Sequence, residues 1–573
     1  MAEFHQRSTR LFNDTSSAPQ DSLQGLVLLY PHINILEIGN TVVRKDYAAM
    51  DTFRILSGGP SGHEPMYSGY VGRGMLSAAV QGDIFRSPTT YEILNVIKEL
   101  AYKNDWGVLL IIQNSSCCAL NFGLAVEKAL TEGIKVKCLL TTDDCSEPLM
   151  PQKSDQSQGL TGTIITIKVA GAMADGFAAC LEEVLEYITE LQKQMSTVLL
   201  VLKPCSLVLE QKCLCTEVNA TLGGDLRSKP KQKLKCLSAN YVVEEMFKEL
   251  SRNVLLDPGS EIVVMINNMC CSTLEENIFI SEFLKKFIAM NINVQRIYVG
   301  TFMTAVDLQG FTVTVIKSSE ELLEYLDYPT EAPSWQMRNF GIETSIQTNI
   351  QPRIKVLSFP RIIPKGPSLS ERESNILLLV VQFACDALIS CRKQLDIMDS
   401  EEGAGDVGMK LEFVANTILK GLKESGINTT NMFAFFKMLS KICDTVNGSL
   451  GAIYSIMFES CANTFGNCDC DDAIDENLWL ECLQNSHIAL KSYTQNEDPA
   501  YNMLAPLIAC SATIQEQISL DRVPILQAFE NGVAEAEMAA MRTTIKHYPD
   551  PGAHAVGIWL RAVYEGVKFR CQY

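Results

Sequence analysis

The sequence predicts an α/β domain followed by an all-helical domain. A chain of 573 residues is too long for one hydrophobic core. Short apolar runs of β type alternate with helical patterns as far as residue 330, whereas sustained helical periodicity follows a proline-rich stretch. We therefore assign residues 1–335 to the first domain, 336–369 to a linker and 370–573 to the second domain.

In the first domain, four short runs rich in Val, Ile and Leu are typical of buried strands. They lie at residues 26–30, 108–112, 198–202 and 262–266. Segments between them, such as 177–191, space their apolar residues as an amphipathic helix does. This alternation predicts helices that flank a sheet.

The stretch from 335 to 369 has no sustained periodicity and carries Pro352, Pro360, Pro364 and Pro367. Beyond it, long segments repeat apolar residues with helical spacing and few β-type runs intervene. We predict helices at residues 375–389, 409–422, 432–443, 450–462, 524–542 and 553–567.

The composition excludes several classes of partner. With 48 basic and 67 acidic residues, the net charge of −19 opposes binding to nucleic acids and to anionic membranes. No apolar run reaches the length of a membrane span, and the N-terminus lacks the apolar stretch of a signal peptide. The 20 cysteines contain no Cys-x-x-Cys pair. These features predict a cytoplasmic protein with reduced thiols.

One run of small residues stands out as a candidate ligand-binding loop. It reads Ser57-Gly58-Gly59-Pro60-Ser61-Gly62-His63-Glu64-Pro65. Glycines let a backbone close on a small polar ligand, and a histidine beside them supplies an imidazole. We expect a flexible loop with His63 fixed at its end.

This run resembles the substrate-binding loop of the dihydroxyacetone kinase family. Further matches in the same order extend the resemblance over nearly the whole chain, at residues 120–125, 168–172, 267–268 and 299–303. The chain is similar to the two-domain kinases of animals. The resemblance implies a first domain of two α/β subdomains that binds a triose, and a second, barrel of helices that binds ATP with Mg²⁺. It also implies a homodimer.

At the substrate site, the residues that carry the family's chemistry differ. The family's covalent histidine aligns with Asp225, and no histidine lies between His63 and His487. Gln113 replaces a lysine, and Cys118 replaces the aspartate that acts as the base. The resemblance therefore implies that no catalytic residue is retained. The substrate-binding positions that it implies are Pro60, Ser61, Gly62, His63, Gln113 and Cys118.

The nucleotide site differs in the same way. Of the family's three metal-binding aspartates, Asp399 and Asp406 remain, and Ala404 takes the middle position. The phosphate loop reads 447–451, where Leu450 replaces a hydroxyl residue. The resemblance implies that the nucleotide-binding positions are Gly405, Asp406, Gly448, Ser449, Leu450, Asn502, Met503, Asp550, Pro551 and Gly552.

Three functional hypotheses follow. The first is an ATP-dependent triose kinase with an altered site, which the resemblance implies. The second is a pseudoenzyme that binds a ligand or regulates a partner, either as a homodimer or paired with an intact paralogue. The third is residual lyase activity on FAD (an FMN cyclase), which the family performs in its nucleotide domain. Because the differences fall on residues that carry chemistry and spare the framework, the residues favour the second.

Overall fold

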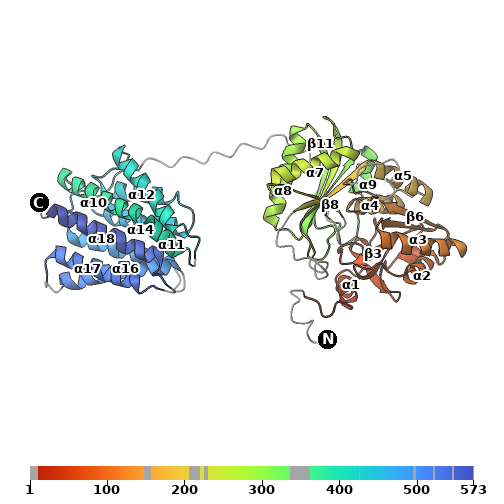
Figure 1. Ribbon diagram of the computed structural model, residues 1–573, viewed down its shortest axis with the longest axis horizontal. Coiled ribbons are helices and arrows are strands. Elements are labelled where there is room, and N and C mark those ends of the chain that lie inside the picture. The colour runs from red at the N-terminus through yellow and green to blue at the C-terminus, as the bar shows by residue number, and fades with distance from the viewer. Residues whose placement is uncertain are drawn as a thin grey trace. The chain divides into compact units, whose positions relative to one another are not determined.

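The computed structural model describes residues 11–146, 157–205, 220–224, 230–335, 362–401, 403–424, 426–493, 499–519, 523–544 and 547–571 (Figure 1). The chain divides into two compact units, Met1–Arg353 and Ile354–Tyr573. The first is α/β and the second is helical, as the sequence predicts. Most of the predicted linker, residues 336–361, and the position of Asp225 lie outside the described residues.

The described helices of the first unit are α1 (Ala18–Leu29), α2 (Thr90–Ala101), α3 (Ser116–Thr131), α4 (Gly162–Gly176), α5 (Leu181–Lys193), α7 (Ala239–Asn253), α8 (Thr273–Ala289) and α9 (Glu320–Asp327). Its described strands are β1 (Ile33–Leu36), β2 (Asn40–Arg44), β3 (Arg54–Ser61), β4 (Ala78–Ile84), β5 (Val108–Gln113), β6 (Val136–Thr141), β7 (Met195–Lys203), β8 (Thr221–Gly224), β9 (Pro230–Lys233), β10 (Glu261–Met269), β11 (Asn293–Gly300) and β12 (Gln309–Lys317).

These strands form two sheets. The first has the order β1-β2-β4-β3-β5-β6, with β4, β3, β5 and β6 parallel to their neighbours in that run. The second has the order β11-β10-β12-β7-β8-β9 and is antiparallel except for the β10–β11 pair. Two sheets, each with its own helices, correspond to the two α/β subdomains that the resemblance implies.

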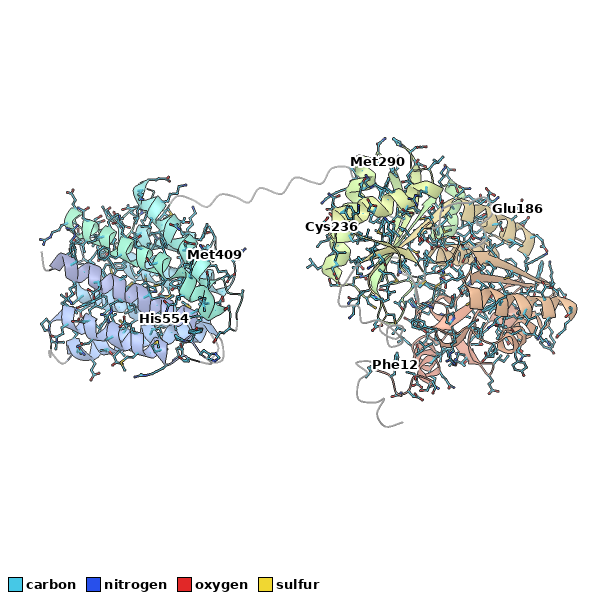
Figure 2. The ribbon with its side chains drawn as sticks, viewed as in Figure 1. Phe12, Glu186, Cys236, Met290, Met409 and His554 are labelled. Atoms are coloured by element: carbon cyan, nitrogen blue, oxygen red, sulfur yellow. The ribbon has the colours of Figure 1, made fainter. Side chains whose placement is uncertain are left out.

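Helix α4 joins the two sheets. It contacts β5 of the first sheet and β7 of the second, and its residues from Gly162 to Ala174 are buried. A helix that is apolar on all sides belongs in a core. One apolar cluster accordingly includes residues of α4 together with residues of both sheets. Side chains fill the space between the elements of each unit (Figure 2).

Three of the four predicted strands are confirmed, as β5, β7 and β10. The prediction for residues 26–30 is wrong, because most of this run is the end of α1. Leu23, Leu26, Val27 and Tyr30 follow the spacing i, i+3, i+4, i+7 and contact the core, whereas Leu28 and Leu29 are exposed. The helix predicted at 177–191 begins later, at Leu181.

The described elements of the second unit are helices. They are α10 (Glu371–Ser390), α11 (Arg392–Asp399), α12 (Val407–Lys423), α13 (Met432–Cys443), α14 (Ser449–Gly466), α15 (Glu476–Tyr493), α16 (Pro499–Ser519), α17 (Ile525–Met541) and α18 (Pro551–Cys571). The six predicted helices are confirmed, and α11, α15 and α16 were not predicted. An apolar core joins α11, α12, α14, α16, α17 and α18.

Helix α10 contradicts the expectation that no apolar run reaches the length of a membrane span. Its length and apolar composition are sufficient to cross a membrane, although no run of that kind was expected. In the structure α10 packs along α12 and α18. Core helices of folded domains also meet this length and composition criterion, but they are mostly buried, whereas 17% of the apolar stretch of α10 is buried.

Candidate functional site

The glycine-rich run is mainly a strand. Residues 57–61 form the end of β3, in which every residue is buried. A Cβ atom on Gly58 would lie 2.2 Å from the carbonyl oxygen of Val80, and one on Gly59 would lie 2.5 Å from the hydroxyl oxygen of Tyr67. These glycines permit close packing, so the expectation of a flexible loop is wrong for residues 57–61.

His63 is fixed beyond the end of this strand. Its side chain is buried, and Nδ1 lies 2.8 Å from the carbonyl oxygen of Thr304. Because a carbonyl only accepts, Nδ1 donates and carries the proton. The ring also contacts Phe85, with 5.5 Å between ring centroids. The fixed imidazole that the sequence predicts is therefore present.

Glu64, the residue after His63, forms hydrogen bonds with its neighbours, although no role was predicted for it from the sequence. The amide of Gly62 donates to Oε2 at 2.8 Å, and Nε2 of Gln81 donates to Oε1 at 3.2 Å. Burial raises the pKa of the Glu64 carboxyl above its ordinary value. Its position beside His63 in the run was the only signal for it.

Gln113 ends β5 on the face of the sheet that α4 covers. Its Oε1 accepts a hydrogen bond from Tyr67, and Nε2 lies 3.3 Å from both the Leu160 carbonyl oxygen and Sδ of Met303. The segment 302–304 reaches both Gln113, through Met303, and His63, through Thr304. The structure thus brings these two predicted substrate positions to one segment.

Asn267 explains two of the further matches. Its Oδ1 accepts the amides of Phe302 and Met303, at 2.7 and 3.0 Å, and Nδ2 donates to the Met303 carbonyl oxygen at 3.0 Å. A buried side chain that satisfies three backbone groups holds this turn in one conformation. Residues 267 and 302–303 therefore shape the site from a distance in sequence.

Cys118 lies on the opposite face of the first sheet. Side chains alternate between the faces of a strand, so Leu110 and Ile112 face away from Gln113. Cys118 packs with them, and with Phe122, in an apolar cluster, and it is 1% exposed. The structure does not bring Cys118 to Gln113 and His63. Pro60 and Ser61 are buried in β3, where the Ser61 hydroxyl donates to the Gly82 carbonyl oxygen at 2.7 Å.

In the helical unit, Asp399 ends α11 and Asp406 precedes α12. Oδ2 of Asp399 accepts the amide of Asp406 at 2.8 Å, with the amide of Val407 at 3.4 Å. A Cβ atom on Gly403 would lie 2.2 Å from Oδ1 of Asp399, so the turn closes tightly on this carboxylate. Asp399 therefore holds the turn between the two helices.

Asp406 pairs with a lysine one helical turn away. Nζ of Lys410 lies 2.8 Å from Oδ1 of Asp406, with the two side chains 26% and 29% exposed. The amide of Lys410 also donates to the Asp406 carbonyl oxygen. Sequence reasoning did not select Lys410, although the i, i+4 spacing to Asp406 on a helix is a signal for such a pair.

These residues do not fit a pair of Mg²⁺ ions. Magnesium requires near-octahedral oxygen ligands, yet one carboxylate closes a turn, the other binds an ammonium group and the side chain of Ala404 has no oxygen. Glu401, a possible substitute, instead lies 3.0 Å from Nδ1 of His547. In the part of the chain that the structure describes, no group of three His, Cys, Asp or Glu side chains is placed to hold a metal.

The remaining nucleotide positions surround the starts of two helices. Gly448 precedes α14 with φ of 94°, a conformation that favours glycine, whereas Leu450 is buried in the core. Oδ1 of Asp550 accepts the amide of Ala553 at 2.7 Å and so caps α18. Gly405 lies in the turn before Asp406, and Pro551 begins α18.

Met503 connects α16 to this region. It is 2% exposed, and a Cβ atom on Gly552 would lie 2.7 Å from its sulfur. Met503 and Leu450 belong to the same apolar cluster. Asn502 lies on α16, and its side chain is outside the described residues.

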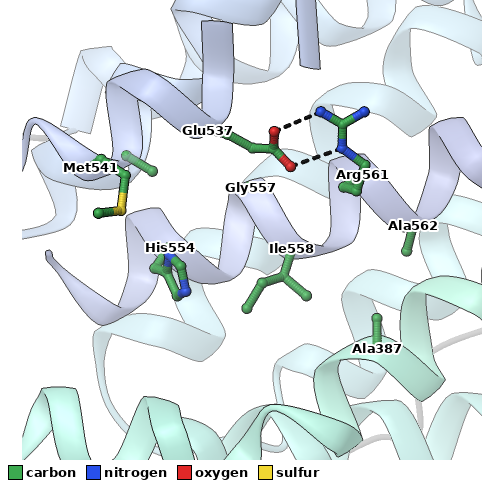
Figure 3. A pocket seen from close by; sticks show the side chains of 9 residues that line it. Ala387, Glu537, Met541, His554, Gly557, Ile558, Arg561 and Ala562 are labelled. Atoms are coloured by element: carbon green, nitrogen blue, oxygen red, sulfur yellow. Dashed lines mark hydrogen bonds and ion pairs between the residues drawn. The ribbon is translucent and has the colours of Figure 1, made fainter. Parts of the chain in front are cut away.

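A separate cavity of about 460 Å³ lies among α10, α17 and α18 (Figure 3). Glu537 and Arg561 form a double ion pair on its wall, at 2.8 and 2.6 Å, and His554 and Ile558 line it on α18. Burial lowers the pKa of His554 below its ordinary value. The cavity contains none of the predicted nucleotide-binding residues.

Comparisons with known proteins agree with this arrangement. Residues 24–334 match the model of the Dak1 domain, and residues 403–565 match that of the DAK2 domain. Human triokinase/FMN cyclase is 28% identical over 97% of this chain and 99% of its own length. The putative 3,4-dihydroxy-2-butanone kinase of Solanum lycopersicum is 28% identical over 98% of each chain.

Solved structures share the fold over the same length. The native dihydroxyacetone kinase of C. freundii has a TM-score of 0.72 at 24% identity, over 97% of this chain and 99% of that enzyme. Its complex with AMP-PNP and Mg²⁺ has a TM-score of 0.69. Because the Dak1 and DAK2 models match in order and relatives are similar along the whole length, this chain belongs to the two-domain, animal-type dihydroxyacetone kinase family.

Proposed function

We propose that this chain is a dihydroxyacetone kinase family protein that has lost phosphoryl transfer and acts by binding a ligand or a partner. The observation that carries the proposal is the position of Cys118, which replaces the family's base. It lies in an apolar cluster with 1% of its surface exposed, on the opposite side of the sheet from Gln113. A thiol there lies among apolar side chains, which do not favour the charged thiolate that acts as a base, whereas Gln113 belongs to the side of the sheet that meets the segment beside His63.

The chemistry of the reaction supports the same conclusion. Transfer to a triose requires a base at the attacking hydroxyl, and loss of a positioned base costs roughly 10²–10⁴ in rate. It also requires that the charge of the triphosphate be neutralised, which carboxylate-bound magnesium does in such enzymes. Both candidate carboxylates already have partners in the protein. Asp399 accepts the amide of Asp406, and Asp406 pairs with the ammonium group of Lys410.

The buried polar groups around His63 are connected by hydrogen bonds. His63, Glu64 and Thr304 are connected by hydrogen bonds, because the Thr304 hydroxyl donates to the Glu64 carbonyl oxygen at 2.7 Å. Such order in buried polar groups favours a retained binding site for a small polar molecule, such as a triose, held without a covalent bond.

The setting that we propose for this protein is the cytoplasm, as a homodimer or paired with an intact paralogue, with no nucleic-acid or membrane partner. Two features support it. The described cysteines are free thiols, and the net charge of −19 repels anionic polymers and surfaces.

The test is ADP release by the purified full chain with ATP and Mg²⁺, with and without dihydroxyacetone. The C. freundii kinase serves as the positive control under the same conditions. We expect no triose-dependent ADP release from a sample that unfolds cooperatively. Turnover that depends on dihydroxyacetone would contradict the proposal and favour an altered kinase, and formation of AMP from FAD would favour a lyase.

A further inference from the structure

We propose that Lys410 supplies a built-in positive charge in place of a divalent metal, so that the helical unit does not bind Mg²⁺. This inference deepens the proposed function and rests on it, since a protein without phosphoryl transfer has no need of a catalytic metal. The central observation is the contact of 2.8 Å between Nζ of Lys410 and Oδ1 of Asp406. An ammonium group thus holds a carboxylate oxygen that the family resemblance assigns to a metal.

The helix fixes the position of this charge. Asp406 precedes the first residue of α12 and Lys410 lies one turn farther along, so both side chains share a face of the helix. Both are only partly exposed, at 29% and 26%, which weakens the competition of water for the pair. α12 carries its neighbour Met409 at the surface of the helical unit (Figure 2).

Lys410 also reaches the predicted phosphate loop. A Cβ atom on Gly448 would lie 3.7 Å from Nζ of Lys410. The ammonium group therefore lies close to both Asp406 and Gly448, which the resemblance assigns to metal and nucleotide binding. Gly448 precedes α14, so the ammonium group of Lys410, on α12, lies near the start of α14.

The other two positions that the family uses for metal binding do not make up for the pairing of Asp406 with Lys410. Asp399 accepts the amides of Asp406 and Val407, and residue 404 is an alanine. Two carboxylates and one ammonium group leave a net charge of −1, whereas three aspartates without a lysine give −3. Like charges repel, so a divalent cation at Asp406 would face the ammonium group at close range.

The test measures Mn²⁺ binding to the full chain by electron paramagnetic resonance of the free ion, without nucleotide. We expect the wild type to show no site tighter than about 1 mM. The double variant Ala404→Asp with Lys410→Met restores a carboxylate and removes the ammonium group. It should bind Mn²⁺ at least roughly 10-fold more tightly, by analogy with the 10–100-fold effects of changes around metal ligands.

Two controls separate a local effect from a change in net charge. Lys410→Arg keeps the positive charge and should bind Mn²⁺ as weakly as the wild type. Ala404→Asp with Lys420→Met removes an exposed lysine of α12 that lies 4.0 Å from Glu424, and it should not gain the tighter site. Cooperative unfolding in urea identifies variants that fold.

Stoichiometric binding of Mn²⁺ to the wild type at micromolar concentration would overturn the inference, and this result requires no variant. Equal gains from the Lys410 and Lys420 double variants would also overturn it, because the effect would then come from net charge. The proposed function is tested by a different result. Triose-dependent ADP release would contradict it, whatever affinity for Mn²⁺ is measured.

Discussion

The phenol of Tyr67 donates a hydrogen bond of 2.5 Å to Oε1 of Gln113, and both side chains are buried. Tyr67 belongs to the loop that follows β3, and Gln113 ends β5. This bond ties the segment that carries His63 to the C-terminal end of β5, between β3 and β6 in the first sheet. It also orients the amide that stands where the resemblance places a lysine, so Gln113 has a structural role.

Tyr67→Phe should therefore destabilise the first unit. The change leaves Oε1 of Gln113 buried without this donor, which costs roughly 1–3 kcal/mol in the free energy of unfolding. Urea denaturation followed by circular dichroism measures the loss. Tyr91→Phe, at a tyrosine that is 76% exposed, is the matched control and should change stability by less than about 0.5 kcal/mol. Equal effects at both positions would contradict the assigned role.

Cys118→Asp should destabilise the protein even though it restores the family's residue type. An unpaired carboxylate in the apolar cluster of Cys118 and Phe122 costs roughly 3–5 kcal/mol. Thermal and urea unfolding check the result against Cys236→Asp, at an exposed thiol. A stable Cys118→Asp protein that gained triose-dependent turnover would place residue 118 at the substrate instead of in the core.

Lys168 should make stability depend on pH. Its ammonium group is buried in α4 and donates to the Tyr325 carbonyl oxygen at 2.7 Å. Burial lowers its pKa from 10.5 to about 7, with a smaller opposing effect of Asp327. Between these values the unfolded chain binds more protons than the folded one, so this residue makes stability rise with pH from about 7 to about 10.5.

The contribution of Lys168 to that slope is at most about 1.4 kcal/mol per pH unit. Urea midpoints for the wild type and Lys168→Met, measured from pH 7 to pH 10, isolate it. We expect the difference in stability between the two proteins to change across this range in favour of the wild type at high pH. A difference that is constant with pH would show that Lys168 does not change its charge there.

Leu450→Ser should destabilise the helical unit. Leu450 is 9% exposed and packs in the core of that unit, so replacing it with a small hydroxyl residue costs roughly 2–5 kcal/mol. Ser449→Ala, at an exposed neighbour, is the control. Urea unfolding of both variants measures the difference. A neutral Leu450→Ser would mean that the loop tolerates the family's residue type without repacking.

Local patterns predicted much of the fold. The strands β5, β7 and β10 are apolar runs buried on both faces, and such runs are recognisable without tertiary information. Residues 26–30 mislead because a short apolar run suits either a strand or the end of a helix. Helices α15 and α16 were missed because they mix polar and apolar residues with little periodicity, and α16 contains Pro506.

The candidate site was harder to predict, because its neighbours are distant in sequence. Residue types predicted the fixed imidazole of His63, and the structure supplied its partner, Thr304, 241 residues away. Gln113 and Cys118 are five residues apart and face opposite sides of one sheet. Lys410 was overlooked because its place beside the predicted phosphate loop, 3.7 Å from where a Cβ atom on Gly448 would lie, depends on the tertiary fold.

The sequence by itself determined the order of the two domains, the family and the positions at which the chemistry has changed. These depend on residue types and on periodicity along the chain, which can be read without coordinates. Only the tertiary structure decided which of the changed positions meet. Cys118 lies in the core, and Gln113 accepts a hydrogen bond from Tyr67. Lys410 forms an ion pair with Asp406, a carboxylate of the predicted metal site. Side-chain direction and the packing of distant segments fix these contacts, and neither is encoded in local spacing.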